Sequence, residues 1–350
     1  MNPSGSNPAA WRAVATLYNA LVTALVVSLV ARRGANTARE YVFRHFRRQH
    51  LEKFLPGLAK LGLSGEPHAV ACALYHYHSN ALGGVKTEYV RESDRKAWVR
   101  YPPPRWMWRG TAIAAIPHEV SAAMLHGWHG HNGASLGNPR LGFVCTGMTV
   151  DGMPGLEGYY LEHDRELGLD ERVRFAYGVE TMPRFDPEAA PKLEAASWPE
   201  ERLVRTRRRY AMDYVRTMLA VLEDLLGAQD ARKELGRVAR LVGLQFYEET
   251  AFDPLPAGPE AFARWLAAVL QGQGEDVTVE ASGGESVVTL ERWCLAEGLA
   301  LRDPRSAFEA WNELWIGACA AHDRFLTLET VHAVVDGELS ARWRVVASRA

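Results

Sequence analysis

The feature that most constrains the fold of this chain is a series of sequence blocks that recurs at a nearly constant spacing. The stretch RGANTAREYV, which begins at Arg33, corresponds to LGAQDARKEL, 193 residues later. EPHAVACALYHYHSNALGGVKTEYV, from Glu66, aligns without gaps on a segment 192 residues later, and TVDGMPGLEGYYL, around Asp151, corresponds to VVDGELSARWRVV, 185 residues later. Three blocks in the same order at similar spacings predict an internal duplication.

Each half is predicted to contain the same series of elements: an amphipathic helix, a second helix, two antiparallel strands, a third helix and a final hairpin. Proline opens the second helix in both halves, and Asp-Gly marks the turn of both hairpins. The predicted helices are 37–61, 67 onward and 117–136 in one half, and 230–246, 259 onward and 306–321 in the other. This pattern predicts an α+β protein of two similar halves, each with helices packed on a small antiparallel sheet, forming an internal pseudo-dimer.

The two halves are expected to meet in the segment 184–201, which is rich in Pro, Ala and Glu. We therefore predict an N-terminal repeat over residues 1–195 that carries the site, and a mainly structural C-terminal repeat over residues 196–350.

Composition narrows the class of protein. Apolar residues make up 47% of the 350 residues, so a large core can be buried, and the net charge of −2 gives no basic surface for nucleic acid. The four cysteines are scattered without a CxxC pair, which favours a reducing, cytoplasmic location. No GxGxxG or phosphate-loop motif is present, so no nucleotide cofactor is expected.

The most apolar run, from Leu17 to Arg33, is interrupted by Asn19 and Thr23 and is shorter than the roughly 20 apolar residues of a spanning helix. We expect no transmembrane segment here. A buried or homodimer-forming helix is the favoured interpretation, and a membrane-surface anchor is the alternative.

Histidine and asparagine gather in two stretches of the first half only. The residues are His76, His78 and Asn80 in LYHYHSNALGG, and His126, His129, His131 and Asn132 in HGWHGHNGASLGN. The aligned positions of the second half are Ala268, Leu270, Gly272, Trp311, Leu314 and Ile316, which are apolar. Since one copy does without the polar groups, the fold does not require them, and the first half is the favoured place for a site.

Imidazole titrates near neutral pH, so these histidines suit general acid–base chemistry on a small substrate. The predicted catalytic residues are His76, His78, His129 and His131. The predicted substrate-binding residues are Asn80, His126, Trp128, Asn132, Asn138 and Arg140. A divalent metal held by the same four histidines is an open alternative, although the motif has no signature carboxylate. A further alternative is that the histidines pack at the edge of a core with their nitrogens hydrogen-bonded.

The second half, from GRVARLVGLQFYEETA through TLERWCLAEG to the final hairpin, resembles the bacterial L-2-amino-thiazoline-4-carboxylic acid hydrolase family and, more distantly, 4-vinyl-reductase-type ligand-binding domains. The family's Gly-Asp-x-x-Cys element reads Asp336-Gly337-Glu338-Leu339-Ser340 here, so its cysteine is missing. The resemblance implies a small-molecule pocket between helices and sheet, and hydrolysis of a C–N bond in a ring.

From these observations we expect a catabolic enzyme, a hydrolase of a C–N bond in a small molecule, that uses histidine acid–base chemistry. The alternatives are a non-catalytic small-ligand-binding or sensor protein, and a metal-dependent lyase or hydrolase that uses the histidine cluster.

Overall fold

The computed structural model describes residues 7–193, 198–252 and 257–348, which fall into two compact units. The first unit is Leu29–Pro199, and the second combines residues 1–28 with Glu200–Ala350. Both contain helices and a mainly antiparallel sheet, so the predicted α+β class is confirmed. The expected boundary after residue 195 lies close to the observed one. Most of the N-terminal helix, however, clusters with the second unit rather than with the first half.

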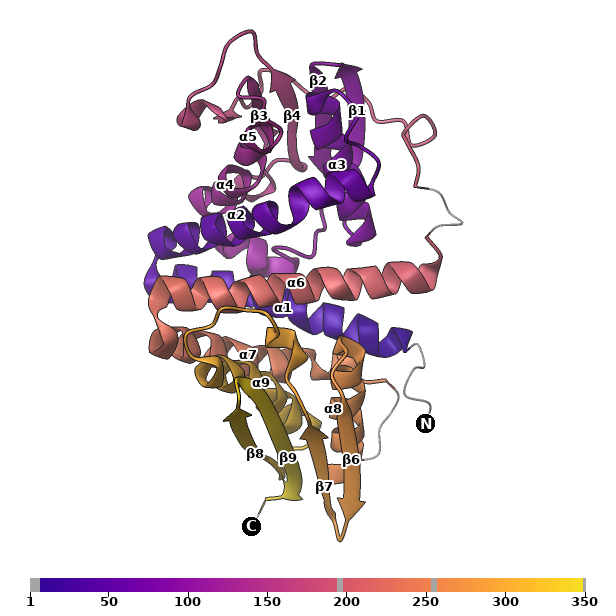
Figure 1. The fold of residues 1–350 in the computed structure, drawn as a ribbon, viewed down its shortest axis with the longest axis vertical. Helices are drawn as coiled ribbons and strands as arrows, with labels where there is room; N and C mark the ends of the chain where they lie inside the picture. The colour runs from indigo at the N-terminus through magenta and orange to yellow at the C-terminus, as the bar shows by residue number, and fades with distance from the viewer. Residues whose placement is uncertain (1–6, 194–197, 253–256, 349–350) are drawn as a thin grey trace. The chain divides into compact units, whose positions relative to one another are not determined.

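The first unit contains a five-stranded sheet in the order β1-β2-β4-β3-β5 (Figure 1). Its strands are β1 (Glu88–Ser93), β2 (Lys96–Tyr101), β3 (Leu141–Gly147), β4 (Leu156–Glu162) and β5 (Val173–Phe175). Its helices are α2 (Ala35–Lys60), α3 (His68–Leu82), α4 (His118–Gly127) and α5 (Asn132–Ser135), with the 3-10 turns η1 (Gly110–Ala115), η2 (His129–His131), η3 (Thr149–Asp151) and η4 (Leu169–Glu171). β5 runs parallel to β3, and this fifth, parallel strand was not part of the predicted antiparallel sheet.

The two faces of this sheet are covered differently. Helix α3 and the turn η2 pack on one face. On the other, Trp98, Val144 and Tyr159 form a core with Met182 from the segment after β5. Because side chains alternate along a strand, Tyr160 points from β4 to the helical face while Tyr159 points to the opposite one. The helical face is where the polar residues of the first half gather.

The third helix of the first unit is broken, although the sequence predicts one helix over 117–136. Helix α4 ends at Gly127, Trp128 caps it with φ −107° and ψ −70°, and the short turns η2 and α5 follow. The corresponding helix of the second unit, α9 (Pro304–His322), is continuous. The break therefore alters the direction of His129 and Asn132 relative to a regular helix.

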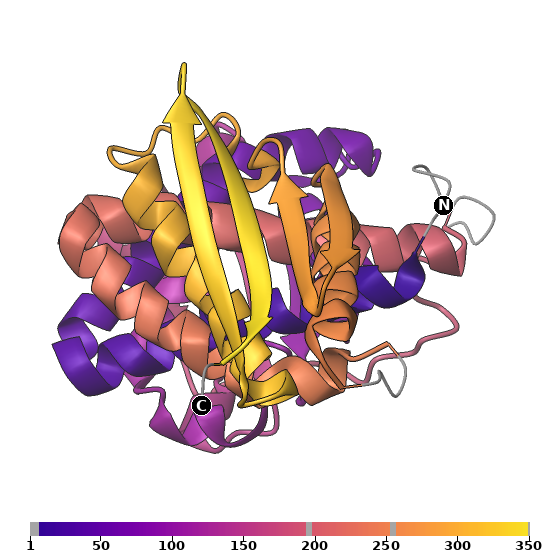
Figure 2. The same cartoon turned by 90° about the horizontal axis from the view of Figure 1, so that it is seen from below.

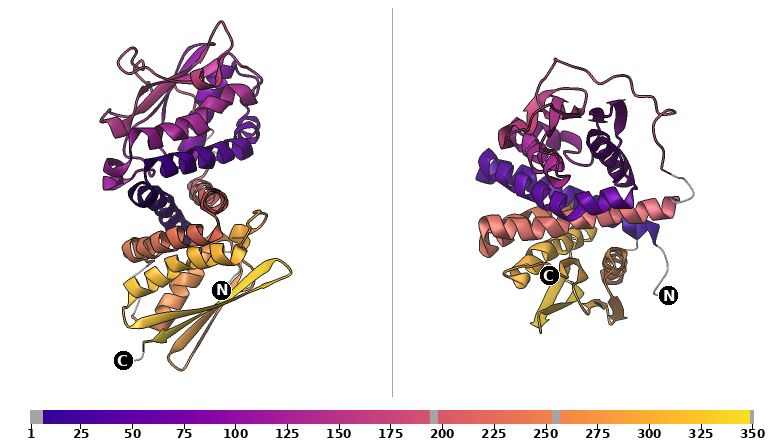
Figure 3. Two further views of the ribbon diagram at one scale, coloured as in Figure 1. Left: turned by 90° about the vertical axis from the view of Figure 1, so that its left-hand side faces the viewer. Right: turned by 45° about the horizontal axis from the view of Figure 1, so that its top comes forward.

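The second unit contains a four-stranded antiparallel sheet in the order β6-β7-β9-β8, with its strands side by side over the helices (Figures 2 and 3). The strands are β6 (Val277–Ser282), β7 (Glu285–Leu290), β8 (Leu326–Val335) and β9 (Glu338–Ala347). The helices are α1 (Pro8–Arg33, up to Ser28 in this unit), α6 (Glu200–Leu226), α7 (Ala228–Thr250), α8 (Pro259–Gln273) and α9, with the 3-10 turn η6 (Cys294–Ala296).

The elements of the two units follow in the same order, and the first four strands of each take equivalent positions in the sheet order. The bounds of β1 and β2 match those of β6 and β7 at a spacing of 189 residues, and those of α3 and α8 match at 191. The observed spacing is therefore one residue shorter than the predicted 192 in the helix and three residues shorter in the strands. At a spacing of 191, His76 corresponds to Ala267 rather than to Ala268, and this equivalent residue is also apolar.

The two Asp-Gly hairpins join equivalent strands but differ in form. Asp336 and Gly337 both have positive φ, 51° and 82°, as in the tight turn that Asp-Gly favours. In the first unit Asp151 ends η3, and three more residues follow Gly152 before β4 begins. The tight-turn prediction is thus confirmed for the second hairpin and wrong for the first.

Within the described residues, α1 is the one helix long and apolar enough to cross a membrane, and 61% of its most apolar window is buried. Leu17, Leu21 and Leu25 are fully buried. The core helix of a soluble protein has the same length and composition, so this is weak evidence for a membrane segment.

Candidate functional site

Six residues of the first unit form a polar cluster within its core, which we call the buried centre. They are His50 on α2, His76 on α3, Trp128 after α4, His129 on η2, Asn132 at the start of α5 and Tyr160 on β4. Of the six, only Trp128 is more than 5% exposed. The helix break described above brings Trp128, His129 and Asn132 to the side chains of α2 and α3.

Ring stacking and hydrogen bonds hold the buried centre together. The imidazoles of His76 and His129 stack with their centroids 4.2 Å apart and their planes at 11°. The Tyr160 hydroxyl is hydrogen-bonded to His129 Nδ1 at 2.6 Å and accepts from Asn132 Nδ2 at 2.8 Å. The same amide nitrogen lies 3.5 Å from His76 Nε2. His76 therefore makes the longest of these contacts.

Burial keeps the imidazoles neutral. It lowers the pKa of His76 from 6.5 to about 3, and electrostatic interactions with His50 and Arg105 lower this pKa further. Burial, followed by the charge of Arg47, likewise lowers the pKa of His50 to about 3. The pKa of His129 lies well below its ordinary value for the same reason, since burial disfavours the charged form.

A side-chain hydrogen bond between His50 and Asn132 raises the pKa of His50 and partly offsets the effect of burial. The indole nitrogen of Trp128, Nε1, is buried and has no hydrogen-bond partner among the described residues. The ring centroids of His50 and Trp128 are 5.6 Å apart. Each buried polar group left without a partner costs about 1–3 kcal/mol, so native folds hold few of them.

The other predicted residues of this stretch lie outside the buried centre. His78 is two residues from His76 on α3, so the two point to nearly opposite sides of the helix. The Asn80 amide donates to the backbone oxygen of His76 within α3. His131 contacts the rings of Phe43 and His50. His126, whose pKa burial lowers, packs near Phe175. The predicted single pocket lined by all these side chains is therefore wrong in its geometry.

Asn138 and Arg140 lie in an open cleft of about 720 Å³, which we call the polar cleft. It is lined by Gly65, Glu66, Pro67, His68, Asp94, Arg95, Gly137, Asn138, Pro139, Arg140, Glu162 and Glu166. None of the six residues of the buried centre lines it. The predicted substrate-binding residues are thus divided between two places in the first unit.

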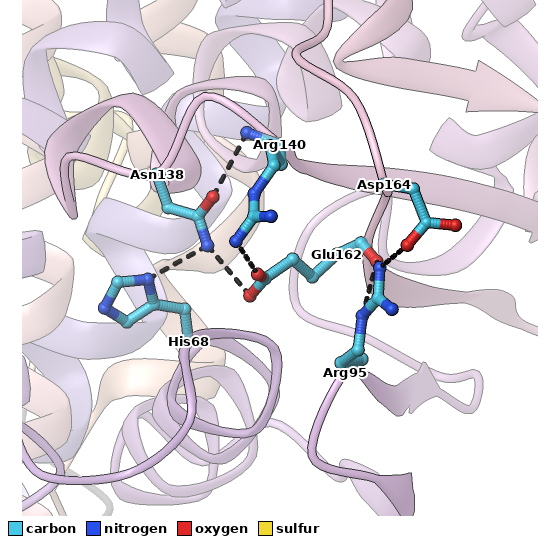
Figure 4. A network of polar contacts seen from close by, with 6 residues as sticks. All are labelled: His68, Arg95, Asn138, Arg140, Glu162 and Asp164. Carbon is cyan, nitrogen blue, oxygen red and sulfur yellow. Dashed lines mark hydrogen bonds and ion pairs between the residues drawn. The ribbon is translucent and has the colours of Figure 1, made fainter.

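Asn138 organises the polar cleft (Figure 4). Its amide oxygen accepts from the backbone N–H of Arg140 at 3.1 Å, which fixes the orientation of the amide. The amide nitrogen then donates to His68 Nδ1 at 3.1 Å and to Glu162 Oε2 at 2.9 Å. The other Glu162 oxygen accepts from Arg140 at 2.7 Å.

A second arginine lies at the same cleft. Arg95 donates to the backbone oxygen of Glu162 at 2.8 Å and to the Asp164 carboxylate at 2.6 Å (Figure 4). The guanidinium holds the pKa of Asp164 below its usual range. The Arg95 and Arg140 side chains are each about half exposed, so a ligand in the cleft can reach charges of both signs.

Metal binding finds no support in the part of the chain that the structure describes. No group of three or more His, Cys, Asp or Glu there is arranged to hold a metal ion. Among the four histidines proposed as ligands, the pair that lies closest, His76 and His129, stacks face to face. Ligand nitrogens instead point at a common centre.

Sequence reasoning missed His50 and Tyr160 at the buried centre and His68 and Glu162 in the polar cleft. A signal existed for His50, which is spaced four and eight residues from the buried Phe46 and Val42 and therefore lies on the apolar side of α2. Tyr160 and Glu162 gave no local signal, because their neighbours come from distant parts of the chain.

Comparison with known protein families, characterised proteins and solved structures gives no match for this chain.

Proposed function

We propose that this chain is a small-molecule enzyme that hydrolyses a C–N bond, and that the polar group of its substrate occupies the buried centre. The observation that carries the proposal is the gathering of buried imidazole, indole and amide side chains at this centre, where Trp128 Nε1 has no hydrogen-bond partner among the described residues. A fold tolerates such a cost where a ligand supplies the missing hydrogen bonds. The corresponding helices of the second unit carry apolar residues instead, so the architecture does not require the polar groups.

The chemistry uses neutral imidazoles. Of the three histidines, His76 makes the weakest hydrogen bond, so its Nε2 is the nitrogen most available as a base. Water adds across the C–N bond: its oxygen bonds to the carbon, and His76 transfers a water proton to the departing nitrogen. Hydrogen-bond donors beside the carbon stabilise the charge that develops on its oxygen. The resemblance to the thiazoline-carboxylate hydrolase family is consistent with this reaction class.

The test is a screen for hydrolysis. The purified chain is incubated with small linear and cyclic amides, ureas and amidines, and products that have gained one water are detected by NMR and mass spectrometry. Replacing His76 with Phe should lower turnover by about 10²-fold. The matched control is Trp315→Phe, a buried ring of the second unit, which should keep full turnover. Equal turnover of His76→Phe and the wild type would refute the assignment.

The second candidate is a non-catalytic small-ligand-binding protein, favoured by the polar cleft. Arg140 and Glu162 lie side by side there, so a ligand with both a carboxylate and an amino group finds a partner for each. Saturable binding of such a zwitterion, without conversion by the wild-type chain, would favour this candidate over the enzyme.

We also propose that the two units arose by duplication and associate as a pseudo-dimer within the chain, in a reducing, cytoplasmic compartment. The shared element order and the matching strand bounds support the duplication. An experimental structure with the units related by about a two-fold rotation would support the pseudo-dimer, and any other arrangement would refute it.

A further inference from the structure

Strand β8 of the second unit is an edge strand without the features that usually protect an edge. It has ten residues and a single neighbour in its sheet, β9 (Figure 1). Its register with β9 runs from Leu326 to Val335 without a bulge, and its sequence, LTLETVHAVV, contains no Pro, Lys or Arg. Soluble proteins commonly block an edge with a bulge, a proline, a basic side chain or a covering segment, because a free edge pairs with another strand.

The hairpin determines which backbone groups of β8 are free. The Asp-Gly turn after β8 has positive φ at both residues, so Val335 and Glu338 form a hydrogen-bonded pair. Such pairs alternate along an antiparallel ladder, and the bond from the Ser348 N–H to the Phe325 oxygen follows the same alternation. The residues whose N–H and C=O groups point away from β9 are therefore Leu328, Thr330, His332 and Val334. No described residue outside the sheet forms a backbone hydrogen bond with these four.

Large apolar side chains are exposed along the same edge. Thr330 and His332 point toward α9, where they contact Asn312 and Phe308, so the residues between them point to the opposite face. On that face Val331 is 72% exposed and Val335 is 66% exposed, and Phe325, directly before β8, is 63% exposed. Exposed apolar side chains beside free backbone groups are typical of a surface that pairs with another strand.

We propose that β8 pairs antiparallel with β8 of a second copy of this chain, so that two four-stranded sheets join into one across a two-fold axis. Only residues with outward backbone groups can exchange hydrogen bonds, which limits the pairing to a few registers. The register centred on Thr330 uses the greatest length of the strand. It places Phe325 of one copy opposite Val335 of the other, and Val331 of one copy opposite Glu329 of the other.

The neighbouring registers are less favourable. A pairing centred on Glu329 would place two carboxylates opposite each other, which is destabilising. A pairing centred on Val331 would bring Leu326 opposite the Asp-Gly turn and would lose its hydrogen bonds with Val334. The register centred on Thr330 has neither fault, and it covers the exposed apolar side chains of both copies with each other. The strand is thus complementary to itself, and for this reason we assign a second copy as the occupant.

The test is sedimentation of the full-length chain over a range of concentrations, for which we expect a monomer–dimer equilibrium. Thr330→Pro removes the central N–H from both copies and should weaken the dimer by about 10-fold or more. An edge strand tolerates proline where the N–H faces solvent, so the variant should remain folded, which circular dichroism checks. The matched control is Thr330→Val, which also loses the bond from Asn312 to the Thr330 hydroxyl but keeps the N–H. It should keep the affinity of the wild type.

Charge at Val331 tests the register and leaves the backbone groups intact. Val331→Asp places a carboxylate opposite Glu329 of the other copy and should weaken the dimer by about 3–10-fold, whereas Val331→Lys places an amine there and should weaken it less. These variants decide the matter if Thr330→Pro does not fold. A wild-type chain that stays monomeric up to about 100 µM would overturn the proposal, and so would a dimer that Thr330→Pro and Val331→Asp leave intact. Equal weakening by Val331→Asp and Val331→Lys would overturn the register.

Discussion

The imidazole of His76 lies flat against that of His129, with 4.2 Å between the ring centroids. Two protonated imidazoles at this distance would repel each other, and burial removes the water that would screen them. The stack therefore excludes protonation of both rings together, and burial disfavours the charged form of each, which links the fold of the first unit to pH.

Acidification should destabilise the protein below about pH 6.5. The pKa of His76 is lowered to about 3 in the folded state, so between pH 6.5 and pH 3 the unfolded chain binds a proton that the folded chain does not. Each such histidine removes up to ~1.4 kcal/mol of stability per pH unit in this window. Urea unfolding at pH 7, 6 and 5 measures the slope, which His76→Phe should reduce and Trp315→Phe should leave unchanged. An identical slope for His76→Phe and the wild type would contradict the lowered pKa.

The same shift predicts the pH profile of the proposed reaction. A general base with a pKa of about 3 is already deprotonated across the neutral range, so kcat/KM should stay level from pH 8 to pH 5. An ordinary histidine, with a pKa near 6.5, would lose half of its activity at that pH. A fall centred near pH 6.5 would show that another group is the base.

Replacing His129 with Leu tests whether this ring serves the reaction or the core. The substitution removes a buried polar ring but leaves the Tyr160 hydroxyl without its hydrogen-bond partner at 2.6 Å. We expect the free energy of unfolding to fall by about 1–2 kcal/mol and turnover by about 10²-fold. A folded variant with full activity would refute the site. Loss of folding in both His129→Leu and His76→Phe would favour the interpretation of these histidines as core residues.

The order of helices and strands could be predicted from the sequence because short local motifs mark where each element begins or turns. Proline before α3 and α8 and Asp-Gly at the final hairpin each mark an element by their own backbone preferences. The break after Gly127 was missed, although Gly127, Gly130 and Gly133 lie close together there and glycine disfavours a helix interior. It depends on packing of the turn η2 against β3. The positions of His129 and Asn132 depend on that break. His78 was grouped with His76 for a different reason: residues two apart on the regular helix α3 point to nearly opposite sides, and the sequence interpretation did not apply this periodicity.

A close helix crossing in the second unit is expected to depend on one glycine. A Cβ at Gly317 on α9 would lie 2.1 Å from the backbone oxygen of Arg240 on α7, closer than any real contact. Gly317→Ala should force the helices apart and lower the free energy of unfolding by about 2–3 kcal/mol. The control is Gly65→Ala, where a Cβ meets nothing within 4 Å, and its stability should change by less than about 0.5 kcal/mol. Equal stability of the two variants would show that the crossing is looser than described.

The polar cleft separates structural from recognition residues, and two substitutions should show this. Asn138 is 8% exposed and joins the half-buried His68 and Glu162 and the Arg140 backbone, so Asn138→Ala removes three hydrogen bonds and should cost about 1–3 kcal/mol of stability. Arg140 is paired with Glu162 at the surface, and such exposed ion pairs contribute little to stability, so Arg140→Ala should change stability by less than about 1 kcal/mol.

Ligand binding by the polar cleft is tested with the same variant. Arg165→Ala, which breaks the exposed pair with Glu171 outside the cleft lining, is the matched control. If the cleft binds a zwitterionic ligand, calorimetry should show weaker binding for Arg140→Ala and unchanged binding for Arg165→Ala. Equal affinities for these two variants would exclude Arg140 from recognition and leave its bond to Glu162 as a surface ion pair.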